Sequence, residues 1–389
     1  MRLLNVVIKC FREQKRDLWV LGLSLAFAPL FVVIYYLMTG ATGSTSYSVL
    51  VINRDQPARL ASGGSLAAGE EIVRSLRGLS YKNGSPLLKV SLSASQAQAE
   101  RQVRDRQAAV LVIIPPGFSA ALAAYQAGDT SASAQLTLEG DLTNPYYTIA
   151  AVMVMTAADE FIGQAVNAPR PVTLNEVALG ASASRSEFEN YIPGLLVMAV
   201  VLLVFQAAMM PARDIESGAL LRLRLTPVTS FEYLGGLSVW LTLVAVLSIL
   251  ITFATAAACG FRSQGPLWLA ILIDITAALS VIAIGLIVAC LARTVTHAFV
   301  IANFPLGLLM FLTGAAFPLP RPALLSLFGR ALSYADFLPP THAVIALNKI
   351  FTLGAGLKDV VFELAMLVTL TALYFSAAVW LFRRTQMKL

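Results

Sequence analysis

The sequence predicts an α-helical polytopic membrane protein. Its expected parts are six transmembrane helices arranged one plus five, a re-entrant hairpin, and an external α/β domain between the first and second spans. Hydrophobic residues make up 57% of the 389 residues, charged residues make up 13%, and the mean hydropathy is +0.74. Long uncharged apolar runs recur along the chain, and one long polar stretch separates the first run from the rest. Soluble globular domains carry about 25% charged residues, so the composition excludes a soluble enzyme, a coiled coil and a disordered protein.

The chain begins with a polar, basic segment, residues 1–17, which we expect to form a cytoplasmic amphipathic helix. Residues 18–38 follow as the first span, because a bilayer core about 30 Å thick needs roughly 20 apolar residues of helix. This run is longer than the core of a signal peptide, so we interpret it as an uncleaved anchor. A cleaved signal peptide is the alternative, because small residues follow the run. Five more uncharged runs predict the remaining spans, at residues 191–211, 233–259, 267–292, 298–318 and 360–382.

Residues 322–347 form a further apolar stretch, which Arg330, Asp336 and the pair Pro339-Pro340 interrupt. Charges and prolines make a lipid-facing crossing costly. We therefore expect a re-entrant or interfacial helical hairpin on one face of the membrane. A full seventh crossing is the alternative.

The distribution of Lys and Arg predicts the orientation. With the N-terminus inside, the cytoplasmic tails and loops hold twelve of these residues, whereas the two short outside loops hold five. Positive residues are enriched in cytoplasmic loops. Both termini are therefore expected in the cytoplasm, and the chain is expected to be multi-pass in the cytoplasmic (inner) membrane. The net charge of +6 is then a topology signal, and no nucleic-acid partner is expected.

Residues 41–190, placed outside the membrane, alternate strand and helix patterns. Strands are expected at 47–53, 87–92, 109–114 and 134–139, and helices at 66–76, 94–106, 119–126 and 144–166. Asn144 and Pro145 suit the N-cap and first position of the last helix. The alternation indicates a small α/β layer with a mostly parallel or mixed sheet. This insert contains no His and no Cys, so we interpret it as a folding, docking or gating module rather than a hydrolase.

The segment at residues 212–228, after the second span, reads ARDIESGALLRLRLTPV. It combines acids at Asp214 and Glu216, a flexible Gly218, a leucine and arginine repeat, and a Thr226-Pro227 stop. This pattern is typical of a short amphipathic helix on the cytoplasmic face, suited to being pushed by a soluble partner. A surface loop with topology-setting arginines is the alternative.

This segment resembles the E-x-E-x-G-T…L-x-x-L…T-P signature of the membrane subunits of ABC exporters, in the type-two permease superfamily that exports drugs and lipids. Asp214 replaces the first Glu of that signature, and Ala219 replaces its Thr. Residues 312–319 (LTGAAFPL) are similar to the family's S-G-x-x-F-P segment, and residues 337–343 (FLPPTHA) to its N/L-P-x-T-H/Y element. The resemblance covers essentially the whole chain, and the order of spans matches a branch with a large external domain after the first span.

The resemblance implies a permease subunit that pairs with a second permease chain, as a homodimer or a heterodimer, and rests on a cytoplasmic ABC ATPase. A periplasmic adaptor docked on the external domain is a further candidate partner. The chain has no G-x-x-x-x-G-K-[ST] loop, so we expect ATP and Mg²⁺ on the partner ATPase and no catalytic, cofactor or metal site here. The residues implied in ATPase coupling are Asp214, Glu216, Gly218, Leu220, Thr226, Pro227 and Arg12.

Polar and polarisable side chains inside the spans are candidates for a translocation pathway. An ionisable residue at membrane depth is a functional hypothesis by default, and Asp274 lies in the fourth span. Its alternative role is structural, through pairing with a neighbouring hydroxyl or Arg or a position near the membrane interface. Ordinary helix packing is the alternative for the other candidates, which are Gln206, Phe205, Met198, Asn303, Phe304 and Phe311. Candidate re-entrant or gate positions are Gly314, Pro318, Pro339 and Pro340.

The leading functional hypothesis is export of a hydrophobic or amphipathic compound, including a cationic one, driven by a separate ATPase subunit. Export of a lipid or envelope precursor, or ion efflux by the same machinery, is an alternative. A non-transporting mechanotransmitter and a membrane receptor that acts through the external domain are two others. The acidic cytoplasmic segment with its glycine, residues 212–228, favours the exporter. A receptor that works without an ATPase does not need a helix on which a soluble partner acts.

Overall fold

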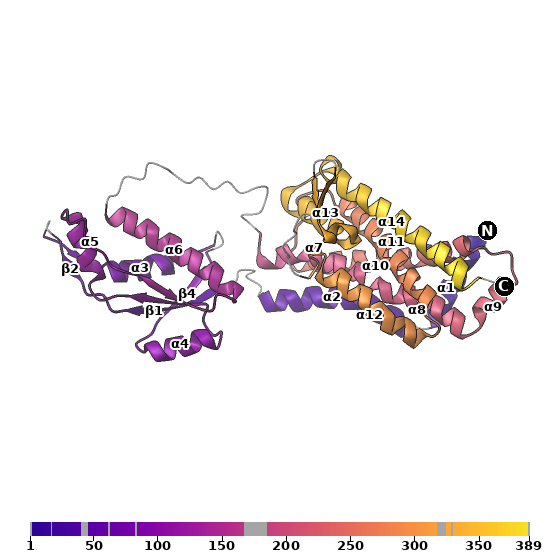
Figure 1. The fold of residues 1–389 in the computed structure, drawn as a ribbon, viewed down its shortest axis with the longest axis horizontal. Coiled ribbons are helices and arrows are strands. Elements are labelled where there is room, and N and C mark those ends of the chain that lie inside the picture. The colour runs from indigo at the N-terminus through magenta and orange to yellow at the C-terminus, as the bar shows by residue number, and fades with distance from the viewer. Residues whose placement is uncertain are drawn as a thin grey trace. The chain divides into compact units, whose positions relative to one another are not determined.

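The computed structural model describes residues 2–16, 18–39, 46–60, 63–81, 84–166, 185–316, 324–327 and 330–387. The chain forms two compact units (Figure 1). The helical unit comprises Met1–Gly43 and Ala178–Leu389, and the α/β unit comprises Ser44–Val177. Each unit has its own hydrophobic core.

The helical unit is built mostly from long apolar helices. They are α1 (Arg2–Arg16), α2 (Leu18–Thr39), α7 (Glu187–Val201), α8 (Leu203–Glu216), α9 (Ala219–Arg224), α10 (Ser230–Ala258), α11 (Leu267–Leu291), α12 (Val295–Phe311), α13 (Pro339–Leu353) and α14 (Leu357–Thr385). Among the described residues, four segments are long and apolar enough to cross a membrane: Phe188–Glu216, Ser230–Ala258, Leu267–Leu291 and Leu357–Thr385. Two shorter apolar helices are Ser24–Met38 and Val295–Phe311. This architecture is that of a polytopic helical membrane protein.

The second predicted span, residues 191–211, corresponds to two helices in the structure. α7 ends at Val201, and α8 begins at Leu203 and continues to Glu216. Leu202 between them keeps helical backbone angles, with φ −65° and ψ −18°. Asp214 and Glu216 therefore belong to the end of the helical segment Phe188–Glu216, which is long and apolar enough to cross a membrane. The prediction of one separate coupling helix over residues 212–228 was wrong in this respect, because only α9 is separate.

The stretch predicted as a re-entrant helical hairpin, residues 322–347, differs from that expectation. Its described part contains β7 (Leu325–Leu327), β8 (Arg330–Leu332), a 3-10 helix (Tyr334–Phe337) and the first turns of α13. Pro339 and Pro340 occupy the first positions of α13, where a missing N–H breaks no helical hydrogen bond. The buried Asp336 carboxylate accepts hydrogen bonds from Ser333 N at 2.7 Å and Ser333 Oγ at 3.0 Å. Prolines and charges expected to interrupt a helix instead begin and cap the elements around them.

The α/β unit is a mixed four-stranded sheet with helices on both faces (Figure 1). Its elements are β1 (Tyr47–Asn53), β2 (Ala58–Arg59), β3 (Ser65–Leu66), α3 (Ala68–Gly78), β4 (Leu88–Leu92), α4 (Gln96–Arg104), β5 (Val110–Ile114), α5 (Phe118–Gln126), β6 (Thr137–Glu139) and α6 (Pro145–Ala165). The strand order is β4-β1-β5-β6, with β1 parallel to β4 and β5 and with β6 antiparallel to β5.

Alternation along β1 explains the two layers of helices. Val49 and Val51 belong to the core that includes α3 and α6, whereas Leu50 and Ile52 belong to the core that includes α4. Successive side chains of a strand point to opposite faces of the sheet. Asn144 caps α6 by accepting a hydrogen bond from Tyr146 N at 3.1 Å, as its sequence position predicts.

α11 lies at the centre of the helical unit and packs most extensively against α14 and α8. Gly285 permits the close approach to α8, because a Cβ there would lie 2.6 Å from Ala207 Cβ and 2.7 Å from Val204 O. α8 is thereby held along its length. This contact positions the end of α8, where the predicted coupling acids lie.

Candidate functional site

The N-terminal helix α1 packs on the beginning of α10. Its buried face includes Val6 and Cys10, which are 4% and 1% exposed. Gly236 makes the contact possible, because a Cβ there would lie only 2.6 Å from Val6 Cβ. Phe11 meets Trp240 edge to face, with ring centroids 5.6 Å apart. The helix is therefore a fixed part of the helical unit.

Asp214 joins α1, α8 and α10 through one buried carboxylate, whose side chain is 7% exposed. Lys9 Nζ lies 2.6 Å from Asp214 Oδ1 and 2.5 Å from Oδ2, and the Tyr233 hydroxyl donates to Oδ2 at 2.7 Å. Glu13 lies 3.3 Å from the same ammonium group. Burial lowers the pKa of Lys9, but the Asp214 carboxylate and the nearby Glu13 together raise it, so the pKa lies above its ordinary value. Charge-assisted hydrogen bonds of this kind are stronger than neutral ones.

Glu216 connects the end of α8 to the beginning of α12. Its Oε2 accepts a hydrogen bond from Val295 N at 2.8 Å. The first backbone N–H groups of a helix have no partner within the helix, and they favour a negative charge beside them. The carboxylate therefore ties the start of α12 to α8.

Gly218 ends α8 and turns the chain into α9. Its φ of +70° is in the left-handed region, which glycine adopts without the steric penalty of a side chain. In α9, Leu220 is buried and Leu221 is 61% exposed, and Leu225, directly after the helix, is 85% exposed. The short helix and its C-cap therefore present two apolar side chains outward.

The turn after α9 is held by Thr226 and Pro227. Thr226 Oγ1 donates to Leu223 O at 2.6 Å, and Arg2 Nη1 from α1 donates to Pro227 O at 2.7 Å. These bonds bring the start of α1 beside the end of the predicted coupling motif.

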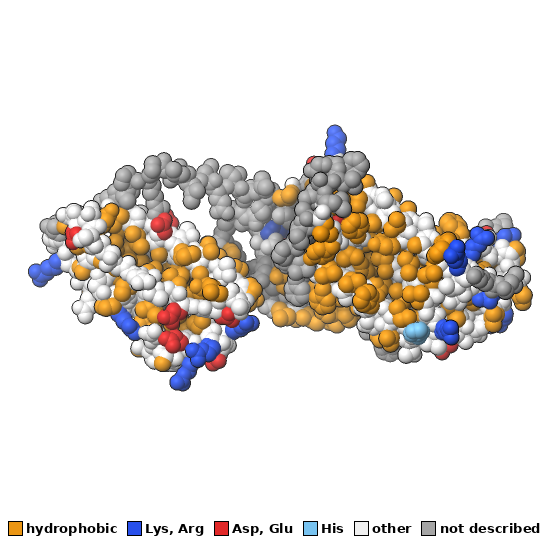
Figure 2. Space-filling model, in the orientation of Figure 1, with side chains coloured by type: hydrophobic (Ala, Val, Ile, Leu, Met, Phe, Trp, Pro, Cys, Tyr) orange, Lys and Arg blue, Asp and Glu red, His pale blue; other side chains and the backbone are white. Residues whose placement is uncertain are grey.

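The end of α14 completes this region. Arg224 donates to Gln386 O, and Gln386 Nε2 donates to Cys290 O at 3.2 Å. Figure 2 shows Lys and Arg side chains gathered at this end of the helical unit, whereas hydrophobic side chains cover the middle of its visible face. Such a division is typical of a membrane protein with a basic cytoplasmic end.

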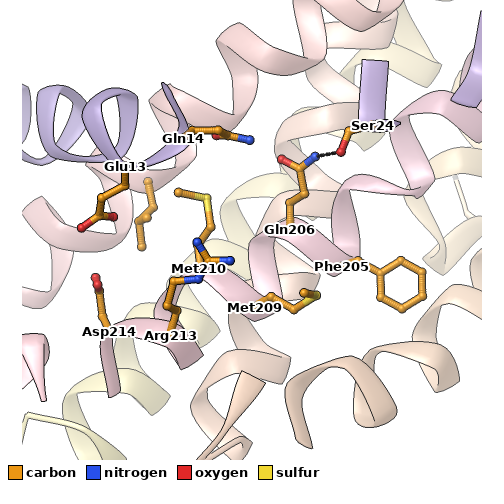
Figure 3. Close-up of a pocket in the computed structure, with 10 residues that line it drawn as sticks. Glu13, Gln14, Ser24, Phe205, Gln206, Met209, Met210, Arg213 and Asp214 are labelled. Carbon is orange, nitrogen blue, oxygen red and sulfur yellow. Dashed lines mark hydrogen bonds between the residues drawn. The ribbon is translucent and has the colours of Figure 1, made fainter. Parts of the chain in front are cut away.

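A cavity of about 180 Å³ lies between α1, α2, α8 and α10 (Figure 3). Glu13 and Asp214 lie at one end of it, Phe205 and Gln206 lie at the other, and Met210 lies between. Gln206 Nε2 donates to the Ser24 hydroxyl at 2.6 Å. The cavity therefore combines an apolar wall with amide and carboxylate groups.

A family model described as ABC-2 family transporter protein matches residues 15–380, nearly the whole chain. This chain belongs to the ABC-2 transporter family. It is accordingly a multi-pass membrane permease subunit of an ABC transporter, in a family whose members work with an ATPase partner. No curated protein matches the chain.

In this ABC-2 permease, the predicted coupling residues lie at one end of the helical unit but face in different directions. Asp214 and Leu220 point inward and are buried. Glu216 and Gly218 lie at the α8–α9 junction. Arg12 is exposed on α1.

Two of the predicted pathway residues, Phe205 and Gln206, line the cavity. Asp274 does not line it. This carboxylate is buried in α11 at 1% exposure, and its Oδ1 has no hydrogen-bond partner among the described residues. Met198 is half-buried in α7.

The three candidates on α12 face outward from this chain. Phe304 and Phe311 are 74% and 54% exposed. Asn303 is also exposed, and its amide nitrogen donates within its own helix to Phe299 O at 2.8 Å. None of these three lines the cavity, so they suit a face toward lipid or another chain.

The candidate gate residues lie at a turn and at a helix start. Gly314 has φ +81° after the end of α12. The neighbouring Ala315 O would lie 2.3 Å from a Cβ on Gly194, so this turn packs closely on α7. Pro339 and Pro340 are buried at the start of α13. Pro318 lies outside the described residues.

Lys9, Gln14 and Tyr233 are site residues that the sequence did not indicate. Lys9 is one of several basic residues in α1, and from the sequence its positive charge indicates only the membrane topology. The available clue was helical spacing, which places Lys9 beside Glu13 at i+4 and next to the buried Cys10.

Proposed function

We propose that this permease subunit exports an amphipathic or hydrophobic compound across the cytoplasmic (inner) membrane. Both termini would lie in the cytoplasm and the α/β unit outside. A second permease chain, identical or paralogous, would complete the pathway, and each chain would rest on a cytoplasmic ATPase subunit that binds ATP and Mg²⁺. Membership of the ABC-2 family and the basic end of the helical unit support this arrangement.

The observation that carries the coupling proposal is the construction of the α8–α9 junction. Leu221 on the six-residue helix α9 and Leu225 directly after it are exposed beside Arg222, where the chain has just turned at Gly218. Exposed apolar side chains rimmed by polar groups are typical of protein–protein contacts. We assign this surface to the ATPase subunit.

Movement of α9 would reach the transmembrane helices by two connections. Glu216 holds the start of α12 at 2.8 Å, and Asp214 holds α1 through Lys9. α8 runs from the junction into the core as a helix, and packed helices move as rigid bodies more readily than they deform. Closure of the ATPase subunits would thus tilt α1, α8 and α12 together.

The cavity lining supports an amphiphile over a bare ion as cargo. A hard cation such as Ca²⁺ takes roughly six to eight oxygen ligands. The cavity instead has Phe205, Met209, Met210 and Leu237 along it, and the Asp214 carboxylate is already paired with Lys9. Apolar surface with a few polar groups is the usual composition of a site for a small organic molecule.

The coupling proposal is tested by Glu216→Ala and Gly218→Pro in the purified complex with its ATPase subunit. Loss of a helix-capping contact costs about 1 kcal/mol, so we expect the ATPase activity that the permease stimulates to fall about fivefold in Glu216→Ala. We expect Gly218→Pro to lower it further, because proline cannot adopt a positive φ. The measurement is ATP hydrolysis and vesicle transport at matched protein insertion.

Glu160→Ala is the matched control, because Glu160 is an exposed glutamate on α6 of the α/β unit. It should leave stimulation unchanged. Normal ATP-driven transport in both junction variants would contradict the coupling assignment. Purification of the chain without any ATPase subunit, under several mild detergent conditions, would contradict the partnership on which it depends.

A further inference from the structure

The cavity between α1, α2, α8 and α10 contains an unsatisfied amide. Gln206 uses its Nε2 to bond Ser24, but its Oε1 is buried and accepts no hydrogen bond from any described residue. A buried acceptor without a donor costs about 1–3 kcal/mol. In Figure 3 this oxygen points into the space that the labelled side chains surround. A donor placed in the cavity would satisfy it.

A second amide faces the same space. Gln14 is 9% exposed, and its Oε1 accepts a hydrogen bond from Trp240 Nε1 at 2.5 Å. That bond orients the side chain, and its Nε2 has no partner among the residues that the structure describes. The nitrogen end points toward Gln206 in Figure 3. The cavity therefore offers one acceptor and one donor, which together match a primary or secondary amide.

The charges around the cavity favour a neutral head group. Asp214 and Glu13 share Lys9, at 2.5 Å and 3.3 Å from its Nζ, and Arg213 adds a positive charge to the lining. These two acidic and two basic side chains carry no net charge together, so the cavity does not strongly attract an ion. The apolar wall of Met209, Phe205 and Leu237 suits an alkyl or aryl chain.

We propose that this cavity is the entry site for the cargo, and that it binds amphiphiles whose neutral head donates a hydrogen bond to Gln206 Oε1 and accepts one from Gln14 Nε2. This proposal rests on the proposed export function and names its substrate class. Ser24 lies in the first turns of α2, so a molecule partitioned into the inner leaflet would reach the cavity at its own depth in the membrane.

The position of the cavity also connects binding to coupling. Phe205, Gln206, Met209 and Arg213 all belong to α8, the helix that ends at the Glu216–Gly218 junction. A bound head group would therefore contact the helix that we assign to the ATPase connection. Cargo binding should then change ATP hydrolysis, whereas a structural lipid in the same cavity should not.

The test uses octanamide, N-methyloctanamide and N,N-dimethyloctanamide, which share a chain but carry two, one and no N–H donors. We expect radiolabelled octanamide and the N-methyl compound to bind the purified full-length chain, and Gln206→Leu to weaken both about tenfold, the loss of one hydrogen bond. The dimethyl compound should bind weakly and be unaffected by the substitution. Asn348→Leu, which removes an exposed amide bonded within α13, is the matched control and should change none of the three.

Two results would overturn the proposal. If Gln206→Leu weakened all three compounds equally, the effect would be on packing and the donor assignment would be wrong. If octanamide bound the complex without changing its ATP hydrolysis, the occupant would be a resident lipid and the cargo assignment would be wrong. Binding to the cavity is measured on the permease alone, whereas stimulated ATP hydrolysis is measured on the complex. A complex without stimulated ATPase activity would therefore contradict the proposed function and not the binding assignment.

Discussion

Lys9 and Asp214 are far apart in the chain, yet among the described residues they form the most buried charged contact at the basic end of the helical unit. The carboxylate is 7% exposed and the lysine side chain 27% exposed. Removing one partner of a buried pair leaves an uncompensated charge, which is far more costly than losing a surface pair. The Tyr233 hydroxyl supplies the remaining donor. This carboxylate therefore attaches α1 to α8 and α10.

We predict that Lys9→Met lowers the free energy of unfolding by about 2 kcal/mol, between the values for exposed and fully buried pairs. Lys15→Met, an exposed lysine of the same helix, is the control and should have little effect.

The same ion pair predicts how stability depends on pH. The pKa of Lys9 is raised in the folded protein, so the stability that its charge contributes is complete below the unfolded pKa of about 10.4. That stability is lost as pH rises through the folded pKa. Thermal denaturation in detergent between about pH 9 and 12 should show this loss in the wild type only. Parallel pH curves for wild type and Lys9→Met would contradict it.

At the scale of elements, the seating of α1 on α10 depends on small residues at the contact. A Cβ at Gly236 would lie 2.6 Å from Val6 Cβ and 3.0 Å from Leu3 O, whereas a Cβ at Gly235 would meet only Leu3 Cδ1 at 3.3 Å. The first position leaves no room for adjustment, since its neighbours include backbone. The second faces the flexible end of a side chain. Helix–helix contacts in membranes commonly use small residues in this way.

We predict that Gly236→Ala displaces α1 and exposes Cys10, which is 1% exposed in the structure. Burial raises the pKa of the Cys10 thiol to about 12, so in the wild type it should react slowly with maleimides, which attack the thiolate. The measurement is the labelling rate of Cys10 in a Cys259→Ser, Cys290→Ser background. The rate should rise severalfold in Gly236→Ala and only slightly in Gly235→Ala. It should not change in Gly307→Ala, where a Cβ meets nothing within 4 Å; equal rates in all three variants would mean that α1 is not seated by Gly236.

For the whole molecule, the membrane orientation is the prediction with the widest consequences. We expect a membrane-impermeant maleimide to label Ser131→Cys, on the α/β unit, from outside the cytoplasmic membrane. Ser217→Cys, at the α8–α9 junction, should be labelled only after that membrane is opened. Both serines are exposed, and the background carries serine at the three native cysteines. The reverse pattern would place the α/β unit in the cytoplasm and remove the proposed coupling surface from the side where ATP is available.

Local signals along the chain were enough to predict much of the architecture. Uncharged runs longer than a bilayer needs locate the apolar helices, because the requirement for internally bonded backbone in lipid acts on each segment separately. The Asn144-Pro145 pair locates the start of α6 for the same local reason. The end of α8 was missed because Ala212–Glu216 reads equally well as a continuation of the span or as a new surface helix. Gly218 with its positive φ, rather than any change in hydropathy, ends it.

The composition, the motif order and the resemblance already indicated an ABC permease, because they are properties of the linear chain. Which side chains meet depended on folding. The Lys9–Asp214 contact, the bond from Val295 N to Glu216 and the cavity around Gln206 each join residues from different helices. Hydropathy and helical period report which face of a helix is apolar, but they carry no information about which helix covers that face. That choice is made by close packing, as at Gly236 and Gly285, where the absence of one Cβ sets how two helices meet.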